Sequence, residues 1–304
     1  MQKQAYKPMT LQELLETFGV EEDEEREQFQ RLLADMEAEG KIVRTRSKRY
    51  GVPERLNLVR GTLQGHPKGF GFVVPDIPGK PDVSVHPNDL NGAMDGDLVL
   101  ARLQGGKRDG LRPEGEVVRI LKRGRTFVVG TFTSPSRHFG FVIPDDRRLP
   151  ADIFIPPEGR NGAKEGQKVV VRLHHYPGAR HSAEGVVTEI LGHKDDPGVD
   201  ILSIIRKYQL PEEFPEEVLR EAEQIPETID PKELEGRRDL RNRTLVTIDG
   251  EDAKDLDDAV SVERLPNGHF RLGVHIADVS YYVKEGSALD REAYRRGCSV
   301  YLVD

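Results

Sequence analysis

An internal repeat in the first two thirds of the chain is the strongest constraint on its fold. One copy begins GTLQGHPKGFGFVVPD at Gly61, and the other begins GTFTSPSRHFGFVIPD at Gly130. Both copies contain short alternating apolar runs separated by Gly, Pro and Asn-Gly, which is typical of short strands joined by tight turns. Because a closed barrel lets such strands pair without free edges, the repeat predicts two small β-barrels in tandem.

The aromatic residues of the first copy predict a surface for single-stranded nucleic acid. In GFGFVV, Phe70 and Phe72 share one face of a strand and Val73 lies on the other. Aromatic side chains are usually buried, so core packing is the alternative interpretation. We favour exposure, because alternation makes at least one face of this strand unlike the barrel interior, and exposed rings can stack on bases of any sequence.

KGFGFV followed by DVSVHP resembles the paired signatures of a cold-shock domain, an OB-type barrel that binds single-stranded nucleic acid. In this interpretation His86 joins the stacking face and Lys68 meets a backbone phosphate. In the second copy Phe154 and Pro156 replace Ser84 and His86, so its ligand face departs from that of the first copy. The predicted RNA-binding residues of the barrels are Lys68, Phe70, Phe72 and His86 in the first copy, and Phe139, Phe141 and Phe154 in the second.

Two amphipathic helices are predicted before the repeat. Thr10 and Glu13 form a capping box for the first helix, which Gly19 ends, and Gly40 ends the second. The basic segment KIVRTRSKRYGVP follows as a short hairpin. This order resembles a winged-helix module, with Arg44–Arg49 as a wing that contacts nucleic acid. A packing domain with a solvated hairpin is the alternative.

Charge and composition limit the class of protein. The net charge of −8 argues by itself against a nucleic-acid partner, but acidic residues concentrate in 13–39 and 212–235, whereas 41–68 is basic. We expect no membrane partner, because no apolar run is long enough to span a bilayer. The N-terminus lacks a secretory pattern and Cys298 is the only cysteine, so a cytoplasmic location is expected.

Residues 194–243 predict a helical connector, because apolar stripes such as Ile201, Ile204 and Ile205 alternate with proline-rich breaks. Four arginines end this segment and precede a run of aspartates. They are able either to pair with carboxylates or to meet RNA phosphates, and we favour structural pairing. These arginines are Arg237, Arg238, Arg241 and Arg243.

The stretch TLVTIDGEDAKDLDDAVSV, residues 244–262, carries the strongest chemical signal. Its flanking apolar runs predict strands, with Asp249 at a strand end and Asp255, Asp257 and Asp258 in the loop that follows. Crowded carboxylates raise one another's pKa unless a cation cancels their charge. Oxygen ligands without Cys or His suit Mg²⁺, or else Mn²⁺, which indicates phosphoryl chemistry. A solvated acidic loop is the alternative.

The spacing of these aspartates, together with GVHIADVSYYV and RRGCSVYLVD, resembles the catalytic region of the ribonuclease II family of 3′-to-5′ exoribonucleases, and within it the ribonuclease R branch. The resemblance implies that the four aspartates hold catalytic Mg²⁺, that Asp257 is essential for hydrolysis, and that Tyr301 stacks on the 3′-terminal nucleotides. It also implies further catalytic residues and an S1-type domain beyond the position of Asp304. We therefore expect this chain to bind RNA but to degrade it barely or not at all.

The sequence thus predicts a multidomain α+β protein. Its expected parts are a winged-helix-like domain (1–58), two OB-type cold-shock barrels (59–125 and 126–193), the helical connector (194–243) and the start of a mixed α/β ribonuclease II-type catalytic domain (244–304). The expected reaction is hydrolysis of single-stranded RNA to nucleoside 5′-monophosphates with Mg²⁺ and no organic cofactor. A non-catalytic cold-shock RNA-binding protein is the main alternative, and a winged-helix DNA regulator is a third.

Overall fold

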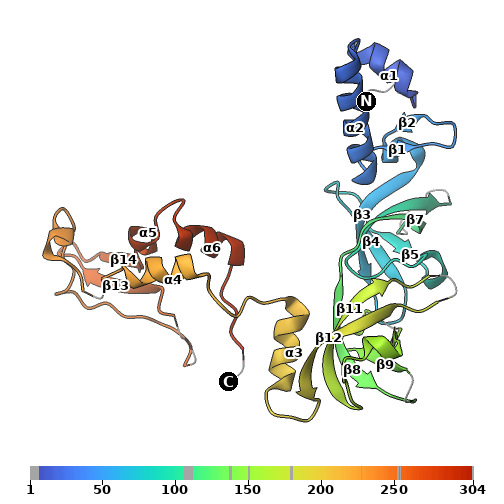
Figure 1. The fold of residues 1–304 in the computed structure, drawn as a ribbon. Helices are drawn as coiled ribbons and strands as arrows, with labels where there is room; N and C mark the ends of the chain where they lie inside the picture. Colours follow the sequence, from blue (N-terminus) through green and yellow to red (C-terminus); the bar gives the residue numbers. More distant parts are fainter. Residues whose placement is uncertain are drawn as a thin grey trace. The chain divides into compact units, whose positions relative to one another are not determined.

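The computed structural model describes residues 7–302, apart from 106–111, 137–138, 150, 179–180, 227, 252 and 254. The chain forms two compact units, Met1–Leu210 and Pro211–Asp304. The first unit contains the N-terminal helices and both barrels, and the second contains the aspartate stretch (Figure 1).

The N-terminal elements are α1 (Leu11–Phe18), α2 (Asp23–Ala38), β1 (Val43–Arg44) and β2 (Tyr50–Gly51). The predicted capping box is confirmed, since Thr10 Oγ1 accepts a hydrogen bond from Glu13 N at 3.2 Å and Glu13 Oε2 accepts one from Thr10 N at 2.8 Å. Leu14, Leu33 and Ile42 form a small core under the hairpin. The two helices and the hairpin are therefore as predicted, while a winged-helix role for them remains a prediction.

Both halves of the repeat form closed five-stranded barrels with the same strand order, as predicted (Figure 1). Each barrel encloses its own apolar core, built around Val73 and Val99 in the first and around Phe132 and Val171 in the second. The strands of the first barrel are β3 (Leu58–Gly65), β4 (Gly71–Pro75), β5 (Val83–Val85), β6 (Leu98–Gln104) and β7 (Glu114–Lys122). Those of the second are β8 (Phe127–Thr133), β9 (Gly140–Pro144), β10 (Ile153–Ile155), β11 (Gln167–His175) and β12 (Glu184–His193).

The glycine that opens each copy of the repeat lies where two strands approach closely. A Cβ atom at Gly61 would collide with the carbonyl oxygen of Val74, and one at Gly130 would collide with that of Ile143. The shared glycine therefore permits the pairing of the first two strands in both barrels.

A partly buried network of charges joins the two barrels. Arg125, in the segment between them, pairs with Asp95 of the first barrel at 2.5 Å and with Asp146 of the second at 2.9 Å. Arg148 bridges the same two carboxylates, at 3.3 Å from Asp95 and 2.7 Å from Asp146. Both aspartates are buried. Helix α3 (Val199–Tyr208) packs against β8, β11 and β12 of the second barrel.

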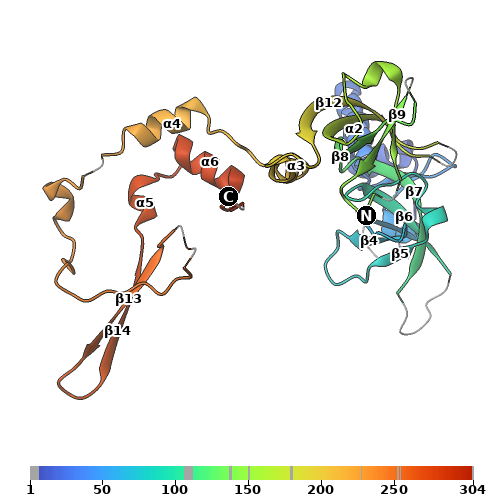
Figure 2. The same ribbon diagram turned by 90° about the horizontal axis from the view of Figure 1, so that it is seen from below.

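The second unit contains a two-stranded hairpin and short helices. The turn Pro266-Asn267-Gly268 joins β13 to β14 as predicted, and Figures 1 and 2 show these strands as a two-stranded ribbon. The N-terminus of α6 is held against α4, because Glu221 Oε2 accepts hydrogen bonds from the backbone N–H groups of Ala288 and Leu289. The elements are α4 (Glu216–Glu223), β13 (Asp258–Arg264), β14 (Phe270–Ile276), α5 (Val279–Tyr282) and α6 (Ala288–Arg296).

The prediction of a strand before Asp249 was wrong. Residues 244–249 form a single bridge, between Val246 and Val260, instead of a continuous strand. The reason is the absence of a covering layer among the described residues: Ile248 is 87% exposed, and Leu272 and Ile276 of β14 are 66% and 70% exposed. A β-branched run is stabilised as a strand mainly by packing against neighbouring side chains.

Acid is expected to destabilise the first unit through Asp146. A side-chain hydrogen bond from Arg148 holds the pKa of Asp146 below its ordinary value of 3.8. The unfolded chain therefore takes up this proton at a higher pH than the folded chain, so the stabilisation is complete above about pH 4 and is lost as the pH falls further. Asp146→Asn should lower the free energy of unfolding at pH 7 by about 1–3 kcal/mol. It should also flatten the dependence on pH below about 4 in urea titrations.

Asp152→Asn is the matched control, because Asp152 is an exposed aspartate of the same barrel. It should keep the wild-type dependence on pH. If the free energy of unfolding depended on pH equally in both variants, the role of Asp146 would be contradicted.

Candidate functional site

The predicted aromatic face of the first barrel is present on β4. Gly71 and Val73 are buried, whereas Phe72 between them is only half-buried, as alternation predicts. The rings of Phe70 and Phe72 meet edge to face, with centroids 5.5 Å apart and planes at 89°. These two rings therefore form a partly exposed aromatic surface beside Ser84, which pairs with Phe72 across β4 and β5.

Two further side chains extend this surface. The imidazole of His66 stacks on Phe70, with centroids 4.2 Å apart, and the guanidinium of Arg112 lies 5.0 Å from the ring centroid of Phe72. The tight turn ending at Gly69, with φ of 89°, brings His66 back to Phe70, and His66 N donates to Phe70 O at 2.8 Å. The sequence HPKGF could have indicated His66, because this residue is close to Phe70 in the chain. No local pattern indicated Arg112, because it is distant from Phe72 in the sequence.

The other two predicted residues of the first barrel, Lys68 and His86, lie close to this face in the sequence. Lys68 is exposed in the turn between His66 and Phe70. His86 is exposed directly after β5, and its Nδ1 accepts a hydrogen bond from Asn88 N at 3.4 Å. Their binding roles remain predictions.

The second barrel carries three rings at the equivalent place. Phe141 of β9 pairs with Phe154 of β10, and their centroids are 5.8 Å apart. Phe139 lies 5.8 Å from Phe141 and 6.1 Å from Phe154. All three are half-buried, so this cluster keeps an exposed aromatic surface although it lacks the histidine of the first copy.

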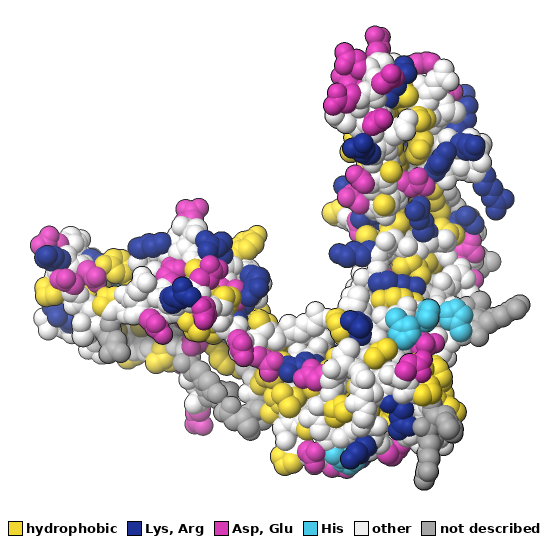
Figure 3. All heavy atoms as spheres, viewed as in Figure 1, with side chains coloured by type: hydrophobic (Ala, Val, Ile, Leu, Met, Phe, Trp, Pro, Cys, Tyr) yellow, Lys and Arg dark blue, Asp and Glu magenta, His cyan; other side chains and the backbone are white. Residues whose placement is uncertain are grey.

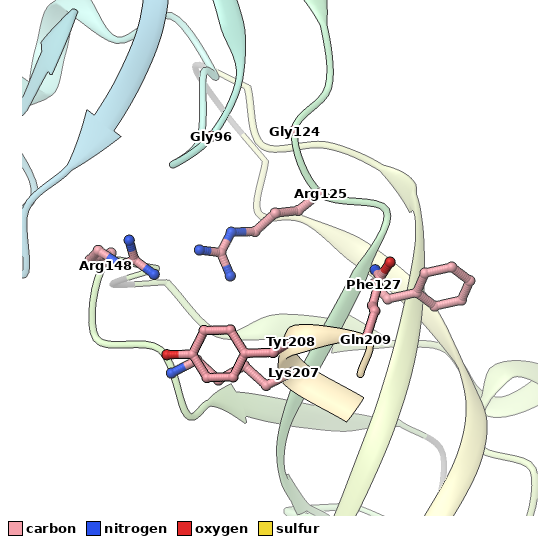
Figure 4. A pocket seen from close by; sticks show the side chains of 8 residues that line it. All are labelled: Gly96, Gly124, Arg125, Phe127, Arg148, Lys207, Tyr208 and Gln209. Carbon is pink, nitrogen blue, oxygen red and sulfur yellow. The ribbon is translucent and has the colours of Figure 1, made fainter. Parts of the chain in front are cut away.

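A pocket of about 340 Å³ lies where the charge network between the barrels meets the end of α3 (Figure 4). Figure 4 shows the side chains of Arg125 and Arg148 facing each other across it, with Lys207 and Tyr208 from α3 opposite. Tyr208 is 61% exposed. Arg125 and Arg148 are already paired with Asp95 and Asp146. Lys207, whose Nζ lies 5.5 Å from the ring centroid of Tyr208, is the cation of this pocket that suits a nucleotide phosphate, and the exposed ring suits its base. The sequence analysis missed this pocket because its residues, from Gly96 to Gln209, are brought together only by folding.

The four predicted metal ligands lie around one loop of the second unit. Asp249, Asp255 and Asp257 are loop residues and Asp258 begins β13; all four are exposed. The backbone oxygen of Asp257 accepts a hydrogen bond from Ala277 N at 2.9 Å, which fastens this end of the loop beside the end of β14. The hydroxyl of Tyr301, a residue with 59% exposure, donates to Asp255 Oδ2.

These carboxylates have the donor chemistry that suits Mg²⁺, but they are not gathered around one point. Among the described residues, the one group of three or more His, Cys, Asp or Glu side chains placed to share a metal ion is a different one, His174, His175 and Glu184. The four aspartates do not form such a group. The magnesium site therefore remains a prediction.

Three of the four arginines before the aspartate loop pair with acidic residues, as we favoured. Arg237 meets Asp278 at 2.9 Å and Arg243 meets Glu263 at 2.9 Å. The hydrogen bond from Arg237 lowers the pKa of Asp278. Arg241 pairs locally with Asp239 at 2.7 Å. None of these three contacts involves a predicted metal ligand.

Comparison with known proteins follows the same division of the chain. Residues 61–120 match the ribonuclease B OB domain family, residues 141–215 the cold shock domain family, and residues 237–304 the RNB domain family. Ribonuclease R of Acidithiobacillus ferrooxidans is 43% identical over 298 residues, which cover 97% of this chain and 67% of that protein. The chain belongs to the ribonuclease R family. The resemblance stated from the motifs is thereby confirmed.

Two more comparisons describe how the chain relates to its family. Ribonuclease R of Thermotoga maritima is 48% identical over 303 residues, and this chain spans 42% of its length. The solved structure of Mycoplasma genitalium RNase R in complex with ribose methylated single-stranded RNA has a TM-score of 0.68 and 30% identity over 80% of this chain and 38% of that one. In the part of the chain that the structure describes, no helix is long and apolar enough to cross a membrane.

Removal of one ring should weaken binding of single-stranded RNA without unfolding the barrel. A stacked base contributes about 1–3 kcal/mol, so Phe72→Ala should raise the Kd for an oligoribonucleotide roughly 5- to 150-fold, as measured by fluorescence anisotropy. Val118→Ala is the control, because it shortens a partly exposed apolar side chain on β7 of the same barrel. An unchanged Kd for Phe72→Ala, or an equal loss in the control, would contradict a stacking role.

Proposed function

We propose that the protein is a 3′-to-5′ exoribonuclease that hydrolyses single-stranded RNA to nucleoside 5′-monophosphates. The observation that carries the proposal is the 43% identity to a ribonuclease R over 97% of the chain, together with the RNB-domain match that contains all four aspartates. Membership of this family does not favour the alternative of a non-catalytic cold-shock protein. The cytoplasm is the expected place of action.

The barrels would gather the RNA. Each presents a group of half-buried rings, and broad stacking suits an enzyme that must accept any sequence. The related Mycoplasma genitalium RNase R has been solved with single-stranded RNA, which supports RNA as the ligand here. The basic N-terminal hairpin would add phosphate contacts if it acts as a wing.

The aspartate loop would carry out the hydrolysis. We assign Asp249 and Asp258 as the first ligands of Mg²⁺, with Asp257 and secondarily Asp255 holding a second ion or the attacking water. Bound Mg²⁺ would lower the pKa of that water and stabilise charge on the leaving 3′ oxygen. Tyr301 supports this arrangement, because its hydroxyl touches Asp255 while its ring is exposed for stacking on the last bases.

These 304 residues alone are expected to bind RNA without shortening it at an enzymatic rate. The aspartates do not converge in the described chain, and the hairpin that carries Asp258 exposes its apolar side chains, such as Val274 at 63%. A 5′-labelled oligoribonucleotide incubated with the chain and Mg²⁺ should give a gel shift and an intact band. Stepwise shortening from the 3′ end at a normal enzymatic rate would overturn this expectation.

In the whole protein, Asp257→Asn should lower the rate of exonucleolytic shortening by about 100-fold or more, while the affinity for RNA is unchanged. Asp257→Asn and Asp258→Asn should also weaken Mn²⁺ binding, which is measured by electron paramagnetic resonance. Glu251→Gln is the control, because Glu251 is an exposed acid of the same loop that we do not assign to the metal. Full activity in Asp257→Asn would exclude the assigned site, and Mn²⁺ binding that is insensitive to both variants would favour a structural loop.

A further inference from the structure

Two histidines and a glutamate meet at the end of β11 and the start of β12. His174 Nε2 lies 2.9 Å from Glu184 Oε1, and His175 Nδ1 lies 3.8 Å from Glu184 Oε2. One ligand atom from each residue lies within 4.8 Å of the other two. The two rings contact each other, with centroids 4.8 Å apart. Figure 3 shows histidine side chains gathered beside acidic ones on this face of the first unit.

A β-bulge produces this convergence. Neighbouring residues of a regular strand point to opposite faces, so His174 and His175 would ordinarily diverge. Here Leu173 pairs with Gly185 and His175 with Glu184, which leaves His174 as an extra residue opposite the partner strand. Leu173 stays in the core, while both histidines are exposed on the outer side. Bulges re-aim side chains in this way.

The equivalent position of the first barrel, at the end of β6 and the start of β7, has no bulge. Leu103 pairs with Gly115 and Gln104 pairs directly with Glu114, so a single glutamine stands opposite Glu114 in the register, and its amide contacts Glu116. The barrel fold therefore requires neither the extra residue nor the histidines. The repeat supplies an internal comparison in which the carboxylate is kept and the imidazoles are absent.

We propose that His174, His175 and Glu184 bind a transition-metal ion of the Zn²⁺ type. Two imidazoles and one carboxylate are a known donor set for zinc, with water in the remaining position. Tetrahedral coordination at about 2.0–2.1 Å separates ligand atoms by roughly 3.3 Å, which lies between the two observed histidine-to-glutamate distances of 2.9 and 3.8 Å. The ion would fasten the end of β11 to β12.

This site would be distinct in chemistry from the aspartate loop. Imidazole nitrogens suit Zn²⁺, Ni²⁺ or Cu²⁺, whereas carboxylate and water oxygens suit Mg²⁺. Millimolar Mg²⁺ is therefore expected to leave zinc bound at the histidines. The proposal does not depend on the exoribonuclease function, because its residues belong to the second barrel and not to the RNB domain.

The test is to measure zinc binding to the metal-free 304-residue chain by isothermal titration calorimetry in the presence of Mg²⁺. We expect one saturable site that His174→Ala and Glu184→Gln each weaken about tenfold or more. Zinc should also raise the Tm of the wild type and not that of the variants. Long-range ¹H–¹⁵N spectra should show zinc-dependent shifts of the ring nitrogens of His174 and His175.

Two control variants make the test specific. Glu114→Gln changes the equivalent carboxylate of the first barrel, and His181→Ala removes an exposed histidine from the connection between β11 and β12. Both should keep the wild-type affinity for zinc. The proposal is overturned if no saturable site is found, if His174→Ala and Glu184→Gln bind zinc as the wild type does, or if the controls lose as much affinity.

Discussion

The ion pairs that Arg125 and Arg148 make with the buried carboxylates of Asp95 and Asp146 join the two barrels. Removing charges from water costs several kcal/mol per ion, so each buried carboxylate must be paired. Here each aspartate contacts both arginines. Asp95 of the first barrel is therefore paired with Arg125 from the segment between the barrels and with Arg148 from the second barrel. Because each carboxylate has two arginine partners, loss of either arginine would weaken the contacts of both aspartates at once. The network therefore couples two otherwise separate cores.

The two barrels share one strand topology and differ in the side chains on their outer surfaces. The glycines at 61 and 130 and the buried valines of β4 and β9 repeat the same packing, so the barrel topology is duplicated. The outer positions are free of that constraint. His66 and Arg112 extend the aromatic face of the first barrel, whereas Phe154 completes that of the second, and only the second has the bulge at His174.

The second unit is organised differently, because its hairpin has no apolar layer on either side within the described residues. Val262, Leu272 and Val274 are each more than 60% exposed, although Asp258, a proposed metal ligand, begins this hairpin. Carboxylates that share a divalent ion must be held close together against their mutual repulsion, and packing provides that restraint. The contacts of Asp257 with Ala277 and of Asp255 with Tyr301 are the part of the restraint that is present here.

The local elements could be predicted from the sequence because their causes are local. The capping box at Thr10, the turn at Asn267-Gly268 and the Phe-Gly-Phe alternation each depend on neighbouring residues. The repeat predicted the two barrels, and the aspartate spacing predicted the family. What only the tertiary structure decided were contacts between distant residues: the pairing of Arg125 across two barrels, the pocket beside Tyr208, and the convergence of His174 and His175 on Glu184. The failure of 244–249 to form a strand has the same origin, since a strand needs partners that the local pattern does not supply.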